Sequence, residues 1–145
     1  MGIEANIGLE VFPNQSNQLG HQVEIVRVTD EGSQAELGTI VRDDVVDPFK
    51  GLIKLKDGTV VLDTEQEEFF EQPQGIYKNK RTKVCFNFDT SRNLEGTIVR
   101  DDMKEPWLTV IKLDIGRYVL TTECQYLPQD LNSSTLTRLR PTKKT

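Results

Sequence analysis

Lysine and arginine are the residues of this chain whose spacing most clearly suggests a chemical task. They form two dense clusters, one inside the chain and one at its end: Lys78, Lys80, Arg81 and Lys83, then Arg138, Arg140, Lys143 and Lys144. Closely spaced cations are typical of proteins that bind the phosphate backbone of nucleic acids. Such contacts give an affinity that depends little on base sequence and falls steeply with salt.

Residues for catalysis or metal binding are sparse. The chain has a single histidine, His21, with no serine or cysteine placed as an obvious partner, and no glycine-rich loop of the kind that holds phosphates. Adjacent aspartates occur as Asp43-Asp44 and again as Asp101-Asp102, but two carboxylates without a third ligand are a weak metal signal. We therefore expect a binding protein with no catalytic residues, no metal and no cofactor.

A proline followed by a large aromatic residue occurs twice, as Pro48-Phe49 and Pro106-Trp107. Each ring could stack on a base or pack on a partner, or it could plug the open end of a small barrel. For Phe49 we slightly favour the interpretation that the ring plugs the barrel. If Phe49 is instead a contact residue, it would bind a protein partner together with Asp43 and Asp44. Trp107 lies beside Lys104 and is the stronger candidate for a contact.

The arrangement of these residues follows from an internal repeat. Residues 38–67 and 96–125 align without a gap, and sixteen of the thirty positions are identical, including an unbroken GTIVRDD. A repeat of this length indicates one supersecondary unit used twice. The sequence thus predicts a first unit over 1–72, a linker over 73–79, a second unit over 80–128 and a polar, basic tail over 129–145.

Charge divides the two halves. Residues 1–75 hold fifteen Asp/Glu and five Lys/Arg, a net charge of −10, whereas residues 76–145 hold eight and thirteen, a net charge of +5. Chance drift of surface charge is the alternative explanation. The clustering of the positive charge favours a functional division, in which the second unit binds nucleic acid and the acidic unit binds a basic partner.

Short apolar runs that are rich in β-branched residues predict an all-β chain. The expected strands are 21–28, 38–42, 52–56 and 59–64, repeated as 82–88, 96–100, 109–114 and 117–122, with 135–140 as a further candidate. Strands this short bury a core only by curling into small barrels. Tight turns are expected at Asp57-Gly58 and Ile115-Gly116. The expected matching core positions are Ile53 and Ile111, Leu55 and Leu113, and Leu62 and Leu120.

The segments VEIVRVTDEGSQAELGTIV and KVCFNFDTSRNLEGTIV, with the hairpins that follow them, resemble SH3-like barrels of the KOW and Tudor type. The resemblance covers roughly residues 21–127, and Gly38 and Gly96 resemble the glycine that ends the first turn of the KOW motif. It implies two tandem barrels and contact with nucleic acid or with the transcription and translation machinery. The chain is also similar to the small MotB-like early DNA-binding proteins of T-even-type phages, although no diagnostic residue carries that similarity.

Tudor-type barrels also suggest an aromatic cage for a methylated amine. Its candidate residues would be Phe86, Phe88, Trp107, Tyr118 and Tyr126, but most of them alternate as core residues do. We therefore expect no cage.

The function that these observations predict is non-specific binding of nucleic acid, duplex DNA rather than RNA, with an effect on transcription or nucleoid organisation. RNA polymerase or a nucleoid protein is the expected protein partner. The alternatives are a protein–protein adaptor and a partial DNA mimic that acts through the acidic unit. The two cysteines, and the lack of a signal sequence or a membrane-length apolar run, favour a cytoplasmic, nucleoid-associated protein with reduced thiols. The expected nucleic-acid contacts are Lys78, Lys80, Arg81, Lys83, Arg100, Lys104, Trp107, Lys112, Arg117, Arg138, Arg140, Lys143 and Lys144.

Overall fold

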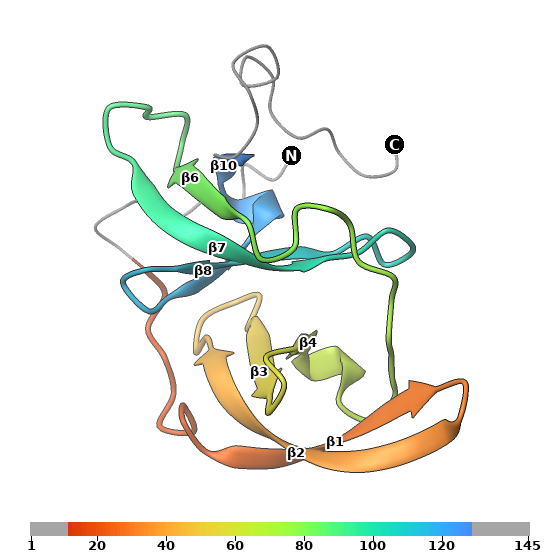
Figure 1. Ribbon diagram of the computed structural model, residues 1–145. Helices are drawn as coiled ribbons and strands as arrows, with labels where there is room; N and C mark the ends of the chain where they lie inside the picture. The colour runs from red at the N-terminus through yellow and green to blue at the C-terminus, as the bar shows by residue number, and fades with distance from the viewer. Residues whose placement is uncertain (1–11, 129–145) are drawn as a thin grey trace. The chain divides into compact units, whose positions relative to one another are not determined.

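The computed structural model describes residues 12–128, which form two compact units (Figure 1). The first unit is Pro13–Gln72, and the second contains Pro73–Pro128 together with Phe12. Both units consist of strands with short 3₁₀ turns, which confirms the predicted all-β class. No helix among these residues is long and apolar enough to cross a membrane.

The first unit is a five-stranded sheet in the order β4-β3-β2-β1-β5. Neighbouring strands from β1 to β4 are antiparallel, whereas β5 pairs with β1 in parallel. A bulge between Ile40 and Arg42 bends β2, which lets the sheet curl as a small barrel requires. The elements are β1 (Gln22–Thr29), β2 (Gly32–Asp43), β3 (Gly51–Leu55), β4 (Val60–Leu62), the 3₁₀ turn η2 (Asp63–Glu65) and β5 (Phe69–Phe70).

The second unit repeats this plan with one change. Its sheet has the order β10-β6-β7-β8-β9, and the matching bulge lies between Ile98 and Arg100. Its last strand pairs antiparallel with β6, whereas the last strand of the first unit is parallel to β1. The elements are β6 (Arg81–Cys85), β7 (Leu94–Asp101), β8 (Thr109–Leu113), β9 (Tyr118–Leu120), the 3₁₀ turn η3 (Thr121–Glu123) and β10 (Gln125–Pro128).

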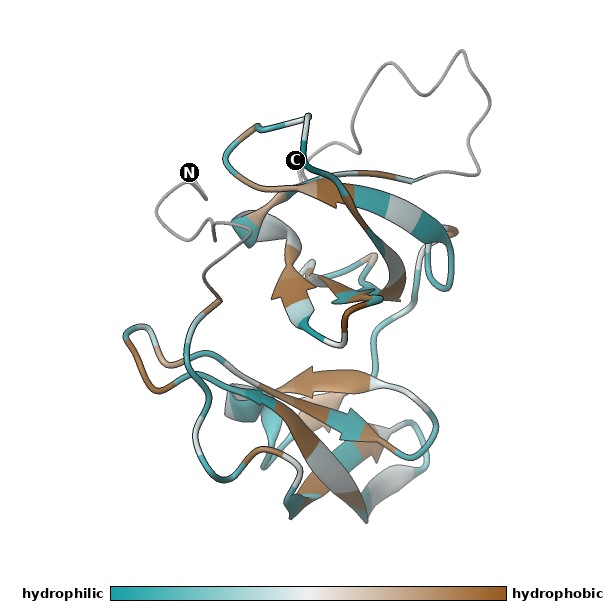
Figure 2. Cartoon of the chain, turned by 90° about the vertical axis from the view of Figure 1, so that its left-hand side faces the viewer, coloured by the Kyte–Doolittle hydropathy of each residue, from teal (hydrophilic) through white to brown (hydrophobic). Residues whose placement is uncertain are grey.

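Apolar residues concentrate on the strands of both units, as the brown segments of Figure 2 show, and β3, β4, β8 and β9 are buried along most of their length. The predicted core pairs Ile53/Ile111 and Leu55/Leu113 are confirmed, since all four side chains are at most 2% exposed. The third predicted pair is confirmed at Leu120, which is 8% exposed, but not at Leu62, which is only half-buried. Val61 and Val119, one residue earlier, belong to the two core clusters.

Glycines shared by the two copies fix the backbone. A Cβ atom on Gly96 would lie 2.7 Å from the carbonyl oxygen of Lys112, so β7 and β8 approach too closely for any other residue. A Cβ on the matching Gly38 would lie 2.6 Å from Ile53 Cγ2. Gly58 and Gly116 have φ angles of 94° and 100°, which confirms that both predicted hairpin turns need glycine.

Each unit also contains a buried cluster of an arginine, an aspartate and a glutamine. In the second unit Arg100 donates to both carboxylate oxygens of Asp102 through Nε and Nη2, each at 3.0 Å, and Gln74 Nε2 donates to Asp102 at 2.8 Å. Arg42, Asp44 and Gln15 form the same contacts in the first unit, at 3.1, 2.9 and 2.7 Å. The arginine and the second aspartate of each RDD triplet therefore form a buried local ion pair.

The expected linker is part of the second unit. Gln74 forms an isolated bridge with Asp102, and its Oε1 accepts from the backbone N–H of Asp101 at 2.7 Å. Gln15 makes the same contacts with Asp44 and Asp43, so the repeat extends upstream of residue 38 and includes this segment. The boundary between the units lies between Gln72 and Pro73.

Candidate nucleic-acid interface

Three predicted cationic contacts lie on the outer face of the second unit's sheet. Strand pairing places Arg81 opposite Thr97, and Thr97 opposite Lys112, so the two cations share one row across β6, β7 and β8. Lys83, two residues after Arg81, lies on the same face in the next row, opposite Glu95. All three cations are exposed, and their strands hold them at fixed spacing on one surface.

Acidic neighbours reduce the charge of this face. Arg81 donates to both carboxylate oxygens of Asp114, at 2.9 and 2.6 Å, and lies 3.5 Å from Glu95. The hydrogen bond with Asp114 raises the pKa of Arg81, and the same bond lowers the pKa of Asp114. The face thus carries three cations and two anions, a weaker positive field than the sequence cluster predicts.

Lys78 and Lys80 lie on a turn that is fixed to β7. The backbone N–H of Asn79 donates to the carbonyl of Ile98 at 2.6 Å, and the N–H of Ile98 donates to the carbonyl of Lys80 at 2.9 Å. Lys80 is exposed and Lys78 is half-buried. This turn therefore holds the two lysines in place beside the strand that carries Thr97.

The two proline–aromatic loops share one backbone shape. The peptide bonds before Pro48 and Pro106 are cis, and the aromatic residue that follows has a φ of 58° at Phe49 and 60° at Trp107. Each turn closes through the aromatic N–H, and the Trp107 N–H donates to the carbonyl of Lys104 at 2.8 Å. The N–H of Leu108 then donates to Asp102, so the buried cluster anchors this loop.

The two rings differ in exposure. Phe49 is 60% exposed, so the slightly favoured interpretation that it plugs the first barrel is wrong. Trp107 is half-buried, and Lys104 in its loop is exposed. An exposed cation beside a partly accessible indole is a combination that can contact a phosphate and a base.

Arg117 stacks on a residue that the sequence did not indicate. Its guanidinium carbon lies 5.0 Å from the centroid of the Phe12 ring, and Phe12 meets Phe86 edge-on with the centroids 5.9 Å apart. Phe12 therefore belongs to the second unit, although it precedes the first unit in the chain. This contact half-buries Arg117 and leaves it less accessible to phosphate than expected.

Two predicted contacts are corrected by burial. Arg100 is 2% exposed and Asp44 is 4% exposed, and each belongs to a buried Arg–Asp–Gln cluster. Neither side chain reaches a ligand. Asp43 is half-buried and accepts a hydrogen bond from Ser16 Oγ, so only Phe49 of the proposed partner contacts is well exposed. The expected contacts Arg138, Arg140, Lys143 and Lys144, and the candidate strand 135–140, lie outside the described residues.

The cage residues do not converge on the surface. Phe86 and Tyr126 belong to the core cluster of the second unit, and Tyr118 is buried and has Lys112 Nζ 6.0 Å from its ring centroid. Phe88 is 64% exposed on a separate loop. Among residues 12–128 there is also no group of three or more His, Cys, Asp or Glu side chains that could hold a metal ion.

Between the two units, charge differs as the sequence indicates. Residues 13–72 carry thirteen Asp/Glu and five Lys/Arg, a net charge of −8, whereas residues 73–128 carry seven and nine, a net charge of +2. Comparisons with protein-family models, curated proteins and solved structures found no match for this chain.

Proposed function

We propose that the second unit binds nucleic acid through phosphate contacts, with duplex DNA favoured over RNA and with little dependence on base sequence. The observation that carries this proposal is a set of exposed cations on one face of the sheet: Arg81 and Lys83 on β6, and Lys112 on β8, with β7 between them. Cations at fixed spacing can neutralise several phosphates at once, and each neutralised phosphate releases counterions.

Two further exposed lysines of this unit would add phosphate contacts. Lys80 lies on the turn fixed to β7, and Lys104 lies on the loop that carries Trp107. The half-buried indole of Trp107, in the loop of Lys104, would add stacking on an unpaired base or a sugar. A KOW-type or Tudor-type barrel with such a surface would act on transcription or nucleoid organisation, beside RNA polymerase or a nucleoid protein, and without catalysis.

A salt titration of the full chain tests the proposal, with duplex DNA, single-stranded DNA and RNA as ligands. The variants Lys83→Ala and Lys112→Ala should each make the log–log salt slope for duplex DNA shallower by roughly 0.9 units, one phosphate contact apiece. Lys54→Ala is a matched control. Lys54 occupies the position of Lys112 in the acidic unit and is also exposed, so its replacement should leave the slope unchanged.

Glu95→Gln gives a test of opposite sign. Glu95 lies opposite Lys83 and 3.5 Å from Arg81, so neutralising it should strengthen binding to duplex DNA at every salt concentration. Equal slopes for Lys112→Ala and Lys54→Ala, or weaker binding by Glu95→Gln, would count against this surface as the phosphate-binding site.

A further inference from the structure

The sheet of the first unit has an apolar outer face. Strand pairing places Val26 opposite Ala35 and Val28 opposite Phe70, with their side chains on one side of the sheet. Leu37, two residues from Ala35 in β2, points to the same side. The alternate residues Ile25 and Phe69 face the core. We call the set Val26, Val28, Ala35, Leu37 and Phe70 the outer apolar face.

This face is accessible. Leu37 is 47% exposed and Phe70 is 49% exposed, Ala35 is also exposed, and Val26 and Val28 are half-buried. Scattered apolar residues on a protein surface need no explanation, but neighbouring apolar residues on three paired strands form a continuous patch. Apolar patches with a polar border are characteristic of interaction sites.

The fold itself does not require this patch, because the second unit lacks it. Lys83 pairs with Glu95 in the second unit at the place where Glu24 pairs with Leu37 in the first. The repeated structure therefore folds with a charged pair at this position. An apolar side chain at the position of Leu37 therefore occurs in the first copy alone, and the sheet does not need it in order to form.

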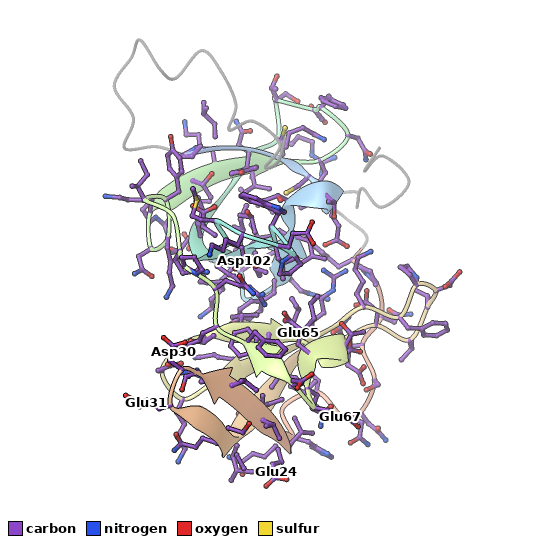
Figure 3. All side chains as sticks on the ribbon, turned by 90° about the vertical axis from the view of Figure 1, so that its right-hand side faces the viewer. Glu24, Asp30, Glu31, Glu65, Glu67 and Asp102 are labelled. Atoms are coloured by element: carbon purple, nitrogen blue, oxygen red, sulfur yellow. The ribbon has the colours of Figure 1, made fainter. Side chains whose placement is uncertain are left out.

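Carboxylates border the outer apolar face. Asp30 and Glu31 form the tip of the β1–β2 hairpin, Glu24 lies near the start of β1, and Glu67 lies beside β1 because Val26 N–H donates to the neighbouring carbonyl of Gln66. Figure 3 shows these four acids at the periphery of the first unit. All four are exposed. One cation adjoins the face as well, because the exposed Lys54 pairs with Thr39, two residues from Leu37 in β2. The four carboxylates outnumber it, so a partner that covers the face must place its own charges against a border that is acidic on balance.

This border selects among possible occupants. A second copy of the chain would bring the four carboxylates and Lys54 against the same set, a net repulsion across the interface. The phosphate backbone of a nucleic acid is repelled for the same reason. A protein surface with apolar side chains flanked by lysine or arginine satisfies both the apolar centre and the acidic border.

We propose that the outer apolar face is a docking site for a protein segment whose apolar side chains are flanked by Lys or Arg. The site lies in the first unit and uses no residue of the nucleic-acid surface, so it stands whether or not the second unit binds DNA. It also gives the acidic unit a protein-binding role distinct from the one predicted from Phe49 and the RDD triplet.

A model peptide that alternates lysine with valine or leucine, KVKLKVK, tests the site on the full chain. Titration followed by amide chemical shifts should perturb β1, β2 and β5, whereas SVSLSVS, without charge, and KSKSKSK, without apolar side chains, should bind at least about tenfold more weakly. Leu37→Ser should weaken KVKLKVK binding by about tenfold or more. Glu24→Lys should weaken it and reduce its dependence on salt.

Leu19→Ser is the matched control, because Leu19 is an exposed apolar residue of the same unit that does not belong to this face. The affinity of this variant for KVKLKVK should equal that of the wild type. Ala35→Glu is a second variant of the face, and it removes no apolar volume. Its effect on KVKLKVK binding can therefore be measured even if Leu37→Ser folds poorly. The proposal is overturned if KVKLKVK leaves the amides of β1, β2 and β5 unshifted, or if Leu37→Ser and Ala35→Glu bind like the wild type. It is equally overturned if sedimentation shows a homodimer that Leu37→Ser dissociates.

Discussion

Removing the Asp102 carboxylate should unfold the second unit. Asp102 is fully buried and accepts hydrogen bonds from Arg100 Nε and Nη2, from Gln74 Nε2 and from the N–H of Leu108. In Asp102→Ala the guanidinium of Arg100, itself 2% exposed, loses its counter-charge inside the protein. Leaving one buried charge uncompensated costs roughly 3–5 kcal/mol.

That cost is comparable to the whole stability of a unit this small. At roughly 0.05–0.15 kcal/mol per residue, about 56 residues are stable by roughly 3–8 kcal/mol. Trp107 is the only tryptophan and lies in the second unit, so its fluorescence during urea titration reports this unit. With a slope of about 1 kcal/mol per molar urea, the midpoint should fall by about 3 M or more, or the native signal should be lost in buffer.

Two further variants isolate the cause. Asp44→Ala removes the same contacts in the first unit and should leave the Trp107 transition unchanged. Arg100→Met combined with Asp102→Leu removes both charges and should recover to within about 1–2 kcal/mol of the wild type, because a buried ion pair adds little over apolar residues. A midpoint shift below about 1 M for Asp102→Ala, or a double variant as unstable as the single one, would refute the reasoning.

Two other expectations concern Trp107 and Asp57. Trp107→Ala should reduce nucleic-acid affinity by roughly 1–3 kcal/mol. It should destabilise the second unit by less than the roughly 3–5 kcal/mol that truncation of a fully buried tryptophan costs. A destabilisation of that full size, with no change of wild-type Trp107 fluorescence on adding nucleic acid, would contradict a role of Trp107 as a contact residue. Burial raises the pKa of Asp57, but hydrogen bonds from Arg27 and Thr59 outweigh burial and lower the pKa to about 2. Because the pKa is lower in the folded state, the Asp57 carboxylate contributes stability that is fully present above the unfolded pKa of about 3.9 and is lost as the pH falls to about 2. Asp57→Asn should lack this part of the pH dependence of stability, measured by far-ultraviolet circular dichroism during acid titration. An acid transition identical to that of the wild type would disprove the contribution.

The parts of the fold that local pattern determines were predictable from the sequence. The repeat predicted two matching units, Gly58 and Gly116 predicted the hairpin turns, and alternation placed Ile53 and Leu55 in the core. These features depend on neighbouring residues or on the period of a strand. Leu62 is half-buried although its match Leu120 is buried, and a strand of three residues is too short for alternation to distinguish the two.

The prediction of a linker over 73–79 was wrong because it relied on the proline and glycine content of this segment and not on the spacing of its glutamine from the aspartates. Pro73 and Gly75 resemble a flexible connection, yet Gln74 precedes Asp101 by 27 residues and Gln15 precedes Asp43 by 28. The single-residue difference lies in the β1–β2 region and hides this part of the repeat from an alignment without gaps. Allowing one gap would have placed both glutamines beside the aspartates that they contact.

The site was harder to predict because sequence shows charge but not its neutralisation. Arg100 and Arg81 look alike in the sequence, but Arg100 is buried against Asp102 and Arg81 is exposed and bound to Asp114. The identity of the RDD triplet in both copies was the available signal. Identity alone does not decide, since the exposed Lys54 and Lys112 are also shared, but an unbroken triplet in two copies of opposite net charge fits a buried ion pair that both units need.

The fold constrains some positions of the repeat and leaves others free to diverge. Positions that fix the backbone are identical, as at Gly38 and Gly96, because a change would prevent the strands from pairing at the observed distance. Positions on the outer faces are under no such constraint. There Leu37 is matched by Glu95, so one copy presents an apolar face with an acidic border and the other presents a charged face. Divergence at these unconstrained surfaces, on a framework that both copies keep, is what two units with different partners would require.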